Sequence, residues 1–128
     1  MSDEMTMVPG KLVGFDLTVP DADGIRDFYK AVIGWDSAGM DMGGYEDYFM
    51  NLPGTGETVA GVCHTRGSNA DLPPVWMVYV AVADIEASLT SVTNLGGKAL
   101  TPIKGGPGDG RYCVIQDPAG AILALMAV

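Results

Sequence analysis

One pattern of strand, helix cap and helix occurs twice in this chain. Residues 13–19 are rich in β-branched and aromatic side chains and predict a strand, and residues 76–82 predict a second strand of the same kind. Asp21 and Asp84 follow the two strands as predicted caps, and they are 84 − 21 = 63 residues apart. A repeat of this length indicates two copies of one supersecondary unit.

An apolar stripe at helical spacing follows each cap. The first stripe is Ile25, Phe28, Tyr29, Val32 and Ile33, and the second is Ile85, Leu89, Val92 and Leu95. Glycine is the preferred residue at the left-handed end of a helix, so Gly34 and Gly97 are predicted terminators. They are again 97 − 34 = 63 residues apart. One offset therefore aligns strand, cap, helix and terminator.

Short strands and turns complete each copy. Further strands are predicted at 45–52 and 58–65 in the first copy, and at 98–103, 111–116 and 121–127 in the second. Each copy is therefore βαβββ. Half of a 128-residue chain is too small to bury a core alone. We expect a single α+β domain over 1–128, with a module at 10–65, a module at 75–128 and a linker at 66–74. The two sheets are expected to form a curved mixed sheet, a cup or partial barrel, with the helices outside.

Composition excludes several classes of partner. The net charge of −9 repels nucleic acid and anionic membranes, and it would attract a cationic small molecule, although colloidal solubility also accounts for it. The chain has no apolar run of about 18 residues, and its first residues lack the pattern of a signal peptide. The expected location is the cytoplasm. Cys63 and Cys113 lack the spacing of a disulfide framework or metal knuckle and are interpreted as reduced, buried residues.

The repeated residues resemble those of the vicinal oxygen chelate superfamily. The resemblance rests on FDLTVPD and FYKAVIGW in the first copy, and on YVAVADIEA, LGGKAL and GRYCVIQDPAGAILAL in the second. This group includes glyoxalase I, extradiol dioxygenases and the bleomycin- and fosfomycin-resistance proteins. The resemblance implies a pair of βαβββ modules that form one cup, usually in a dimer.

The resemblance also implies four positions for the ligands of a divalent metal. Each module of a family enzyme typically supplies one His or Glu from its first strand and one from its last, because a catalytic metal needs several N or O donors. In this chain the first-strand positions fall on Gly14 and Met77, and the last-strand position of the second module falls on Ala124. The looser alignment of the first module leaves three candidates, Ala60, Val62 and His64. Only His64 has a donor side chain, so we expect no usual metal centre and no cofactor.

Two polar residues are candidates for contact with a ligand. Asp16 interrupts the apolar sequence of the first strand and shares a strand face with Gly14 and Thr18. Tyr79 matches Asp16 under the 63-residue offset, so the two would face each other about a pseudo-twofold axis. They could orient a cationic or polar ligand, or hydrogen-bond to each other and close the core. His64, the only histidine, could act as a base, a ligand or a hydrogen-bond partner, or have no role.

The remaining candidates come from the predicted hairpin at 117–120. If this turn has four residues, Arg111 and Cys113 lie on the same strand face as Ala124, and Phe49 is the corresponding site in the first module. The candidate ligand-binding set is Asp16, Phe49, His64, Met77, Tyr79 and Arg111. No catalytic residue is assigned.

These features favour a protein that binds a small molecule, cationic or aromatic, in its cup without the usual metal centre. A homodimer is expected from the resemblance. The alternative is a lyase, isomerase or dioxygenase of the same superfamily with a metal or acid–base site that involves His64 and Asp16. A third hypothesis is an interaction domain whose cup is filled by side chains. The sequence does not identify the ligand.

Overall fold

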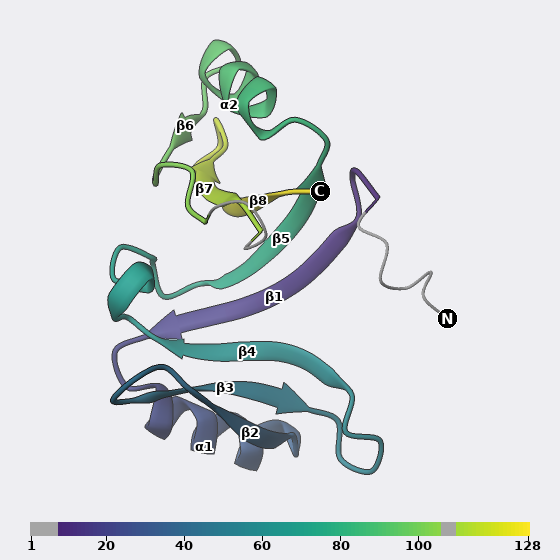
Figure 1. Cartoon of the computed structure of the whole chain (residues 1–128), viewed down its shortest axis with the longest axis vertical. Coiled ribbons are helices and arrows are strands. Elements are labelled where there is room, and N and C mark those ends of the chain that lie inside the picture. The colour runs from purple at the N-terminus through teal and green to yellow at the C-terminus, as the bar shows by residue number, and fades with distance from the viewer. Residues whose placement is uncertain (1–7, 106–109) are drawn as a thin grey trace. The chain divides into compact units, whose positions relative to one another are not determined.

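The computed structural model describes residues 8–105 and 110–128 and contains the two predicted βαβββ modules (Figure 1). The first consists of β1 (Leu12–Val19), α1 (Ala22–Ile33), β2 (Asp36–Asp41), β3 (Glu46–Asn51) and β4 (Thr58–His64), with strand order β2-β3-β4-β1. The second consists of β5 (Trp76–Val82), α2 (Ile85–Asn94), β6 (Lys98–Ala99), β7 (Tyr112–Gln116) and β8 (Ile122–Ala127), with order β5-β8-β7-β6. A short 3-10 helix, Gly67–Asn69, lies between the modules in sequence. The α+β class and the paired modules are confirmed.

The chain divides into two compact units. One is Phe15–Trp76, and the other combines Met77–Val128 with the N-terminal residues up to Gly14. The N-terminal segment joins the second unit by backbone hydrogen bonds, because the Gly10 N–H donates to the Ala81 carbonyl and the Ala81 N–H donates to that of Lys11. The single domain and the shared cup stay predictions. No helix in the described ranges has the length and apolar character needed to cross a membrane.

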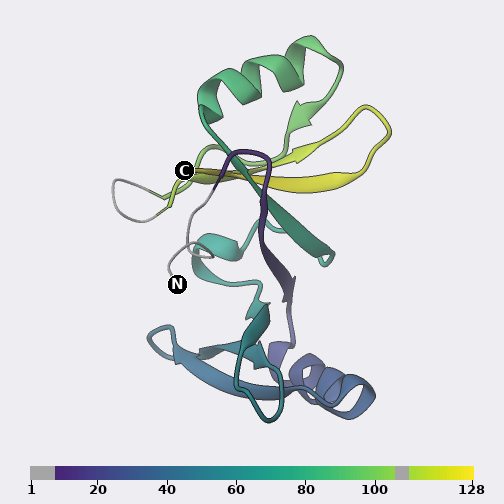
Figure 2. The same cartoon turned by 90° about the vertical axis from the view of Figure 1, so that its right-hand side faces the viewer.

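The predicted caps begin both helices. The carboxylate of Asp21 accepts a hydrogen bond from the Gly24 N–H at 3.0 Å, and that of Asp84 accepts from the Ala87 N–H at 3.0 Å. Gly34 ends α1 in the left-handed conformation, with φ of 91°. The left-handed glycine after α2 is Gly96 rather than the predicted Gly97. In each module the helix covers one face of the sheet, as Figure 2 shows for α2.

The outer strands of the two modules pair in the same register. Asp16 of β1 lies opposite Gly61 of β4, and Tyr79 of β5 lies opposite Ala124 of β8, in parallel pairs. Both members of one pair are 63 residues from their counterparts, since 79 − 16 and 124 − 61 are equal. The repeat seen in the sequence is therefore also a repeat of strand register.

The hairpin between β7 and β8 differs from the prediction. Gln116 pairs with Ile122, so the loop has five residues, 117 to 121, and not four. One extra residue turns every side chain of a strand to the other face. Val114 therefore lies opposite Ala124, and the expectation that Arg111 and Cys113 share the face of Ala124 was wrong.

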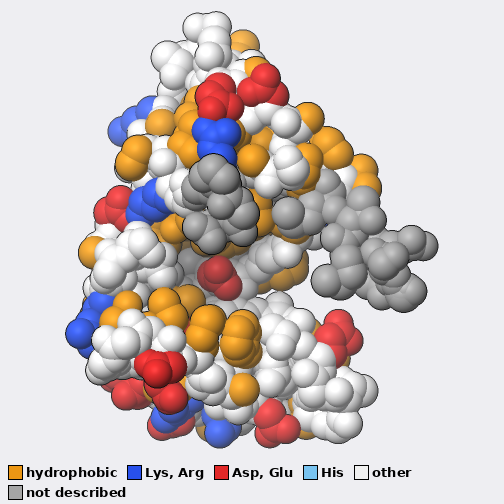
Figure 3. Space-filling model, in the orientation of Figure 1, with side chains coloured by type: hydrophobic (Ala, Val, Ile, Leu, Met, Phe, Trp, Pro, Cys, Tyr) orange, Lys and Arg blue, Asp and Glu red, His pale blue; other side chains and the backbone are white. Residues whose placement is uncertain are grey.

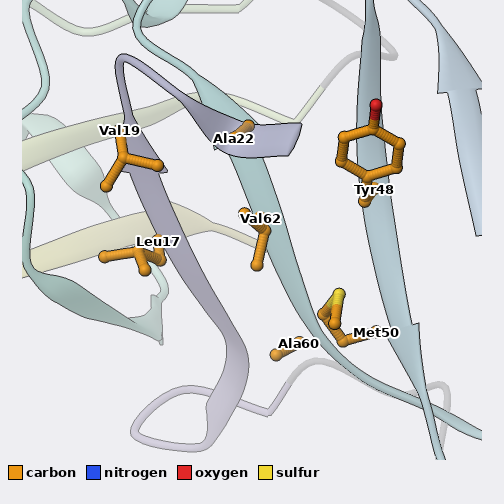
Figure 4. Close-up of a cluster of buried hydrophobic side chains, with 7 residues drawn as sticks. All are labelled: Leu17, Val19, Ala22, Tyr48, Met50, Ala60 and Val62. Carbon is orange, nitrogen blue, oxygen red and sulfur yellow. The ribbon is translucent and has the colours of Figure 1, made fainter. Parts of the chain in front are cut away.

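The core of the first module lies between its sheet and α1. Its buried side chains come from three strands and the helix: Leu17, Val19, Ala22, Tyr48, Met50, Ala60 and Val62 (Figure 4). The equivalent core of the second module contains Ile85, Cys113, Ile115 and Leu125. Both cysteines are free, Cys113 is buried as expected, and Cys63 is only half-buried.

Truncation of the first core should destabilise the fold strongly. Met50 is completely buried, and loss of a buried methionine side chain leaves a cavity, so we expect Met50→Ala to lower the free energy of unfolding by about 2–5 kcal/mol. Val32→Ala is the control, because Val32 lies on α1 with 62% of its surface exposed. Urea unfolding followed by circular dichroism measures both, and equal losses in the two variants would contradict this core.

Candidate functional site

The sheet face of the first module that points away from α1 carries polar residues. Alternation along the strands separates it from the core, and it presents Asp16 and Thr18 from β1, Asp47 and Phe49 from β3, and Gly61 and Cys63 from β4. Asp16, Gly61 and Phe49 form one row across three strands, because both Asp16 and Phe49 lie opposite Gly61. This row places a carboxylate and an aromatic ring on either side of a glycine.

The Asp16 carboxylate lies over Gly61. A Cβ atom at position 61 would be only 2.4 Å from the Asp16 Oδ1, so only glycine leaves room for the carboxylate in this position. Burial raises the pKa of Asp16, and the nearby Asp47 carboxylate raises it further. Within residues 8–105 and 110–128, no hydrogen-bond donor or cation pairs with the Asp16 carboxylate. A half-buried carboxylate without a partner is unusual and suits a ligand-binding group.

Asp47 and Cys63 lie beside this row. Asp47 is 2% exposed and accepts a hydrogen bond from the backbone N–H of His64 at 2.8 Å. Burial, followed by the charges of Asp16 and Asp47, raises the pKa of Cys63 to about 12. Cys63 is therefore a neutral thiol at physiological pH, and a thiolate role is excluded there.

His64 makes contacts with the side of the sheet that α1 covers. Its Nδ1 lies 2.9 Å from the carbonyl oxygen of Glu46, which can only accept, so Nδ1 carries the proton. Its Nε2 lies 3.7 Å from Asp23 Oδ1, and the Tyr48 hydroxyl donates to the same oxygen at 2.5 Å. That hydrogen bond raises the pKa of Tyr48 to about 12. Asp16 is not among the contacts of His64.

The sheet face of the second module that points away from α2 is apolar and buried. Met77 and Tyr79 are 3% and 8% exposed, and Ala124 is completely buried. The Tyr79 ring lies 6.0 Å from that of Tyr112, measured between centroids. Arg111 is on the other side of this sheet, where its guanidinium pairs with the Glu86 carboxylate of α2. Arg111 is thus engaged by the helix.

The register identifies the fourth family position. Ala124 occupies the last-strand position of the second module, and its counterpart in the first module is Gly61, since each lies opposite the equivalent residue of the first strand. The sequence prediction that Ala60, Val62 or His64 occupies this position was wrong. The prediction failed because the spacing of the first module was read without its strand pairing.

The residues do not fit a metal of the family type. The four positions hold Gly14, Gly61, Met77 and Ala124, and none of these side chains is a ligand that a zinc, nickel, manganese or iron centre of this kind uses. In the described part of the chain, no group of three or more His, Cys, Asp or Glu side chains could hold a metal ion elsewhere. No catalytic step is therefore derived through a metal.

Two cavities lie on the helix sides of the modules and are mostly apolar. The larger, about 640 Å³, is lined in part by Ala87, Ser91 and Leu95 of α2, and the smaller, about 310 Å³, by Phe28 and Tyr29 of α1. Neither includes the Asp16 row. We place the candidate site at the row because it contains the unpartnered titratable group, which the cavities lack. Acidic and basic side chains are scattered over the face of the molecule seen in Figure 3.

Paired βαβββ modules with vacant family ligand positions define a superfamily member without the usual donor set. The chain belongs to the Glyoxalase/Bleomycin resistance protein/Dioxygenase superfamily, whose model matches residues 11–125. It is 30% identical over 111 residues to CFP32 of Mycobacterium tuberculosis, a protein named as a glyoxylase, and the match covers 86% of this chain and 42% of that protein. It is 31% identical over 132 residues to the anthracycline biosynthesis protein DnrV of Streptomyces peucetius, covering 91% and 46%. The chain thus spans less than half the length of these curated relatives.

Solved structures show the same fold at low sequence identity. A superfamily member from Vibrio splendidus matches with a TM-score of 0.58 at 15% identity, covering 90% of this chain and 97% of that one. A methylmalonyl-CoA epimerase of Streptomyces coelicolor in complex with 2-nitronate-propionyl-CoA matches with a TM-score of 0.57 at 17% identity, covering 94% and 98%. At these identities the likeness shows the fold alone.

Removal of the Asp16 charge should stabilise the protein. The folded-state pKa of Asp16 is raised above its ordinary value of 3.8, so stability decreases as the pH rises from that value through the raised pKa. Asparagine has a similar shape and no charge. We therefore expect Asp16→Asn to raise the midpoint of thermal unfolding at pH 7, and the gain to shrink below the ordinary pKa, where Asp16 is protonated in both states.

Asp27→Asn is the matched control for this measurement. A hydrogen bond from Arg26 lowers the pKa of Asp27, so its ionised form favours folding and its removal should bring no gain at pH 7. Differential scanning calorimetry at several pH values compares the variants. A lower unfolding midpoint in Asp16→Asn at pH 7 would show that the carboxylate has a stabilising partner.

Proposed function

We propose that this chain binds a small cationic aromatic molecule and does so without the usual metal centre of its superfamily. The observation that carries the proposal is that the four family ligand positions hold Gly14, Gly61, Met77 and Ala124. The net charge of −9 supports a cationic ligand, because the acidic field raises its local concentration.

The proposed contacts lie on the helix-free faces of the modules. Asp16 supplies a charge and Phe49, 39% exposed, supplies an aromatic surface, while Met77 and Tyr79 supply apolar contacts. Arg111 and His64 were also candidates, but their partners Glu86 and Asp47 hold them elsewhere. Their proposed role is therefore to support the fold around the site.

The relatives make anthracyclines a suitable class of probe. One relative is named an anthracycline biosynthesis protein, and anthracycline glycosides combine a planar aromatic ring system with an amino sugar. That combination suits the aromatic ring and the carboxylate of the Asp16 row. A homodimer and a cytoplasmic location remain parts of the proposal, and the exposed apolar side chains of Phe28, Val32 and Ile33 on α1 are compatible with an interface.

Ligand binding is tested with daunorubicin and its amine-free aglycone. We expect daunorubicin to raise the unfolding temperature of the wild-type protein in a concentration-dependent way, because a ligand that binds only the folded state stabilises it. The aglycone should have a smaller effect, since it lacks the cation. Absence of any shift with daunorubicin and with a panel of other cationic aromatic compounds would count against the proposal.

Metal independence is tested separately. We expect purified protein to contain no stoichiometric zinc, nickel, manganese or iron by mass spectrometry, and daunorubicin binding to be unchanged by EDTA. A stoichiometric metal that disappears in His64→Ala would overturn the proposal, because His64 is the only candidate imidazole ligand in the chain.

The second candidate function is acid–base catalysis. The raised pKa of Asp16 supports it, because a carboxyl group with a raised pKa exchanges protons more readily near neutral pH. A site that uses both Asp16 and His64 has less support, because the contacts of His64 are with Asp23, Glu46 and Asp47. Electron density of a substrate-like molecule in a crystal, and its position relative to Asp16, would distinguish the two functions.

A further inference from the structure

We infer that Asp16 has taken the place of the missing last-strand metal ligand of the first module and selects ligands that carry a protonated amine. This inference rests on the proposed binding function and assigns its specificity to one carboxylate and the glycine beneath it. It follows from strand register, from the space above Gly61 and from the partners of the surrounding groups.

The register places Asp16 beside the lost ligand position. In the second module the equivalent pair is Tyr79 and Ala124, where the last-strand residue keeps its Cβ. In the first module the last-strand residue is Gly61, and the Asp16 Oδ1 lies 2.4 Å from where its Cβ would be. The carboxylate therefore fills volume that a ligand side chain at position 61 would need. Asp16 and a side chain at position 61 are mutually exclusive in this arrangement.

The surroundings leave Asp16 available to a ligand. Asp47 is occupied by the His64 backbone N–H, and Cys63 is a neutral thiol. The arginines that form ion pairs among the described residues, Arg26 and Arg111, pair with Asp27 and Glu86. A carboxylate that loses water without gaining a cation is costly, so a bound ammonium group would recover an interaction that the protein does not provide.

Phe49 completes the recognition of an aromatic amine. It lies opposite Gly61 on the other side from Asp16, and neighbouring strands are about 4.8 Å apart. A ring packed on Phe49 therefore holds an attached amine close to Asp16, with Gly61 forming the floor between them. The proposed selectivity is for ligands that carry a ring and an ammonium group at this separation.

Gly61→Ala displaces the carboxylate without removing it. The atom that the new Cβ meets is the end of a flexible side chain, and position 61 has no positive φ, so the fold should tolerate the change. We compare Gly61→Ala, Asp16→Asn and the double variant by fluorescence titration with daunorubicin. Each single variant should weaken binding roughly 10- to 100-fold, as expected for a lost hydrogen bond to a charged group, and the double variant should bind no more weakly than Asp16→Asn.

Gly39→Ala is the matched control. A Cβ at position 39 would lie 2.7 Å from the Glu46 carboxylate, so this variant also displaces a carboxylate from above a strand glycine, but outside the Asp16 row. Daunorubicin affinity should be unchanged. Titration with the aglycone separates recognition from structure, because Gly61→Ala should abolish the preference for the amine and leave aglycone binding intact.

The outcomes distinguish the inference from the function on which it rests. Wild-type protein that binds neither daunorubicin nor its aglycone would overturn both. Wild-type protein that prefers daunorubicin, with the same preference in Gly61→Ala and Asp16→Asn, would overturn the role of Asp16 and leave the binding function intact. Equal weakening of daunorubicin and aglycone in Gly61→Ala would also overturn amine selection and assign a merely structural role.

Discussion

The parallel pairing of the first and last strands of each module determines what its sheet can present to a ligand. In both modules this pairing has the same register, Asp16 with Gly61 and Tyr79 with Ala124. Because strand side chains alternate, the register decides at once which residues pack under the helix and which lie on the free face. The same hydrogen bonds thus place Val62 in the core and Gly61 on the candidate site. Fold and site are set by one constraint.

Local signals were sufficient to predict the modules, but not every strand register. Caps such as Asp21 act within a few residues of themselves, so sequence spacing alone identifies them. The β7–β8 hairpin depends on Asp117, whose carboxylate accepts from the Ala119 and Ala121 N–H groups and draws Ala121 into the loop. The sequence does not show whether that side chain closes a four- or five-residue turn. The faces of Arg111 and Cys113 were therefore predicted wrongly, although the strands themselves were found.

The candidate site was predicted in part for a similar reason. Asp16 could be found because a carboxylate in an apolar strand contradicts the strand pattern, and such contradictions concentrate at functional sites. Gly61 was missed, although a glycine within a strand signals close approach by another group, and it became informative only beside Asp16. His64 was selected by residue type alone, and its contacts with Glu46 and Asp47 come from strand pairing that spacing does not reveal.

Replacement of a metal ligand by a carboxylate that fills the site changes more than the presence of a metal. A bound divalent cation is the largest positive charge in its site and attracts the anionic oxygens of a substrate. Asp16, unpaired and close to Asp47, creates a field of the opposite sign at the equivalent place in the fold. Its burial also opposes folding, so packing alone does not explain a carboxylate there. A ligand of positive charge removes both difficulties, since it matches the field and supplies the partner that Asp16 lacks.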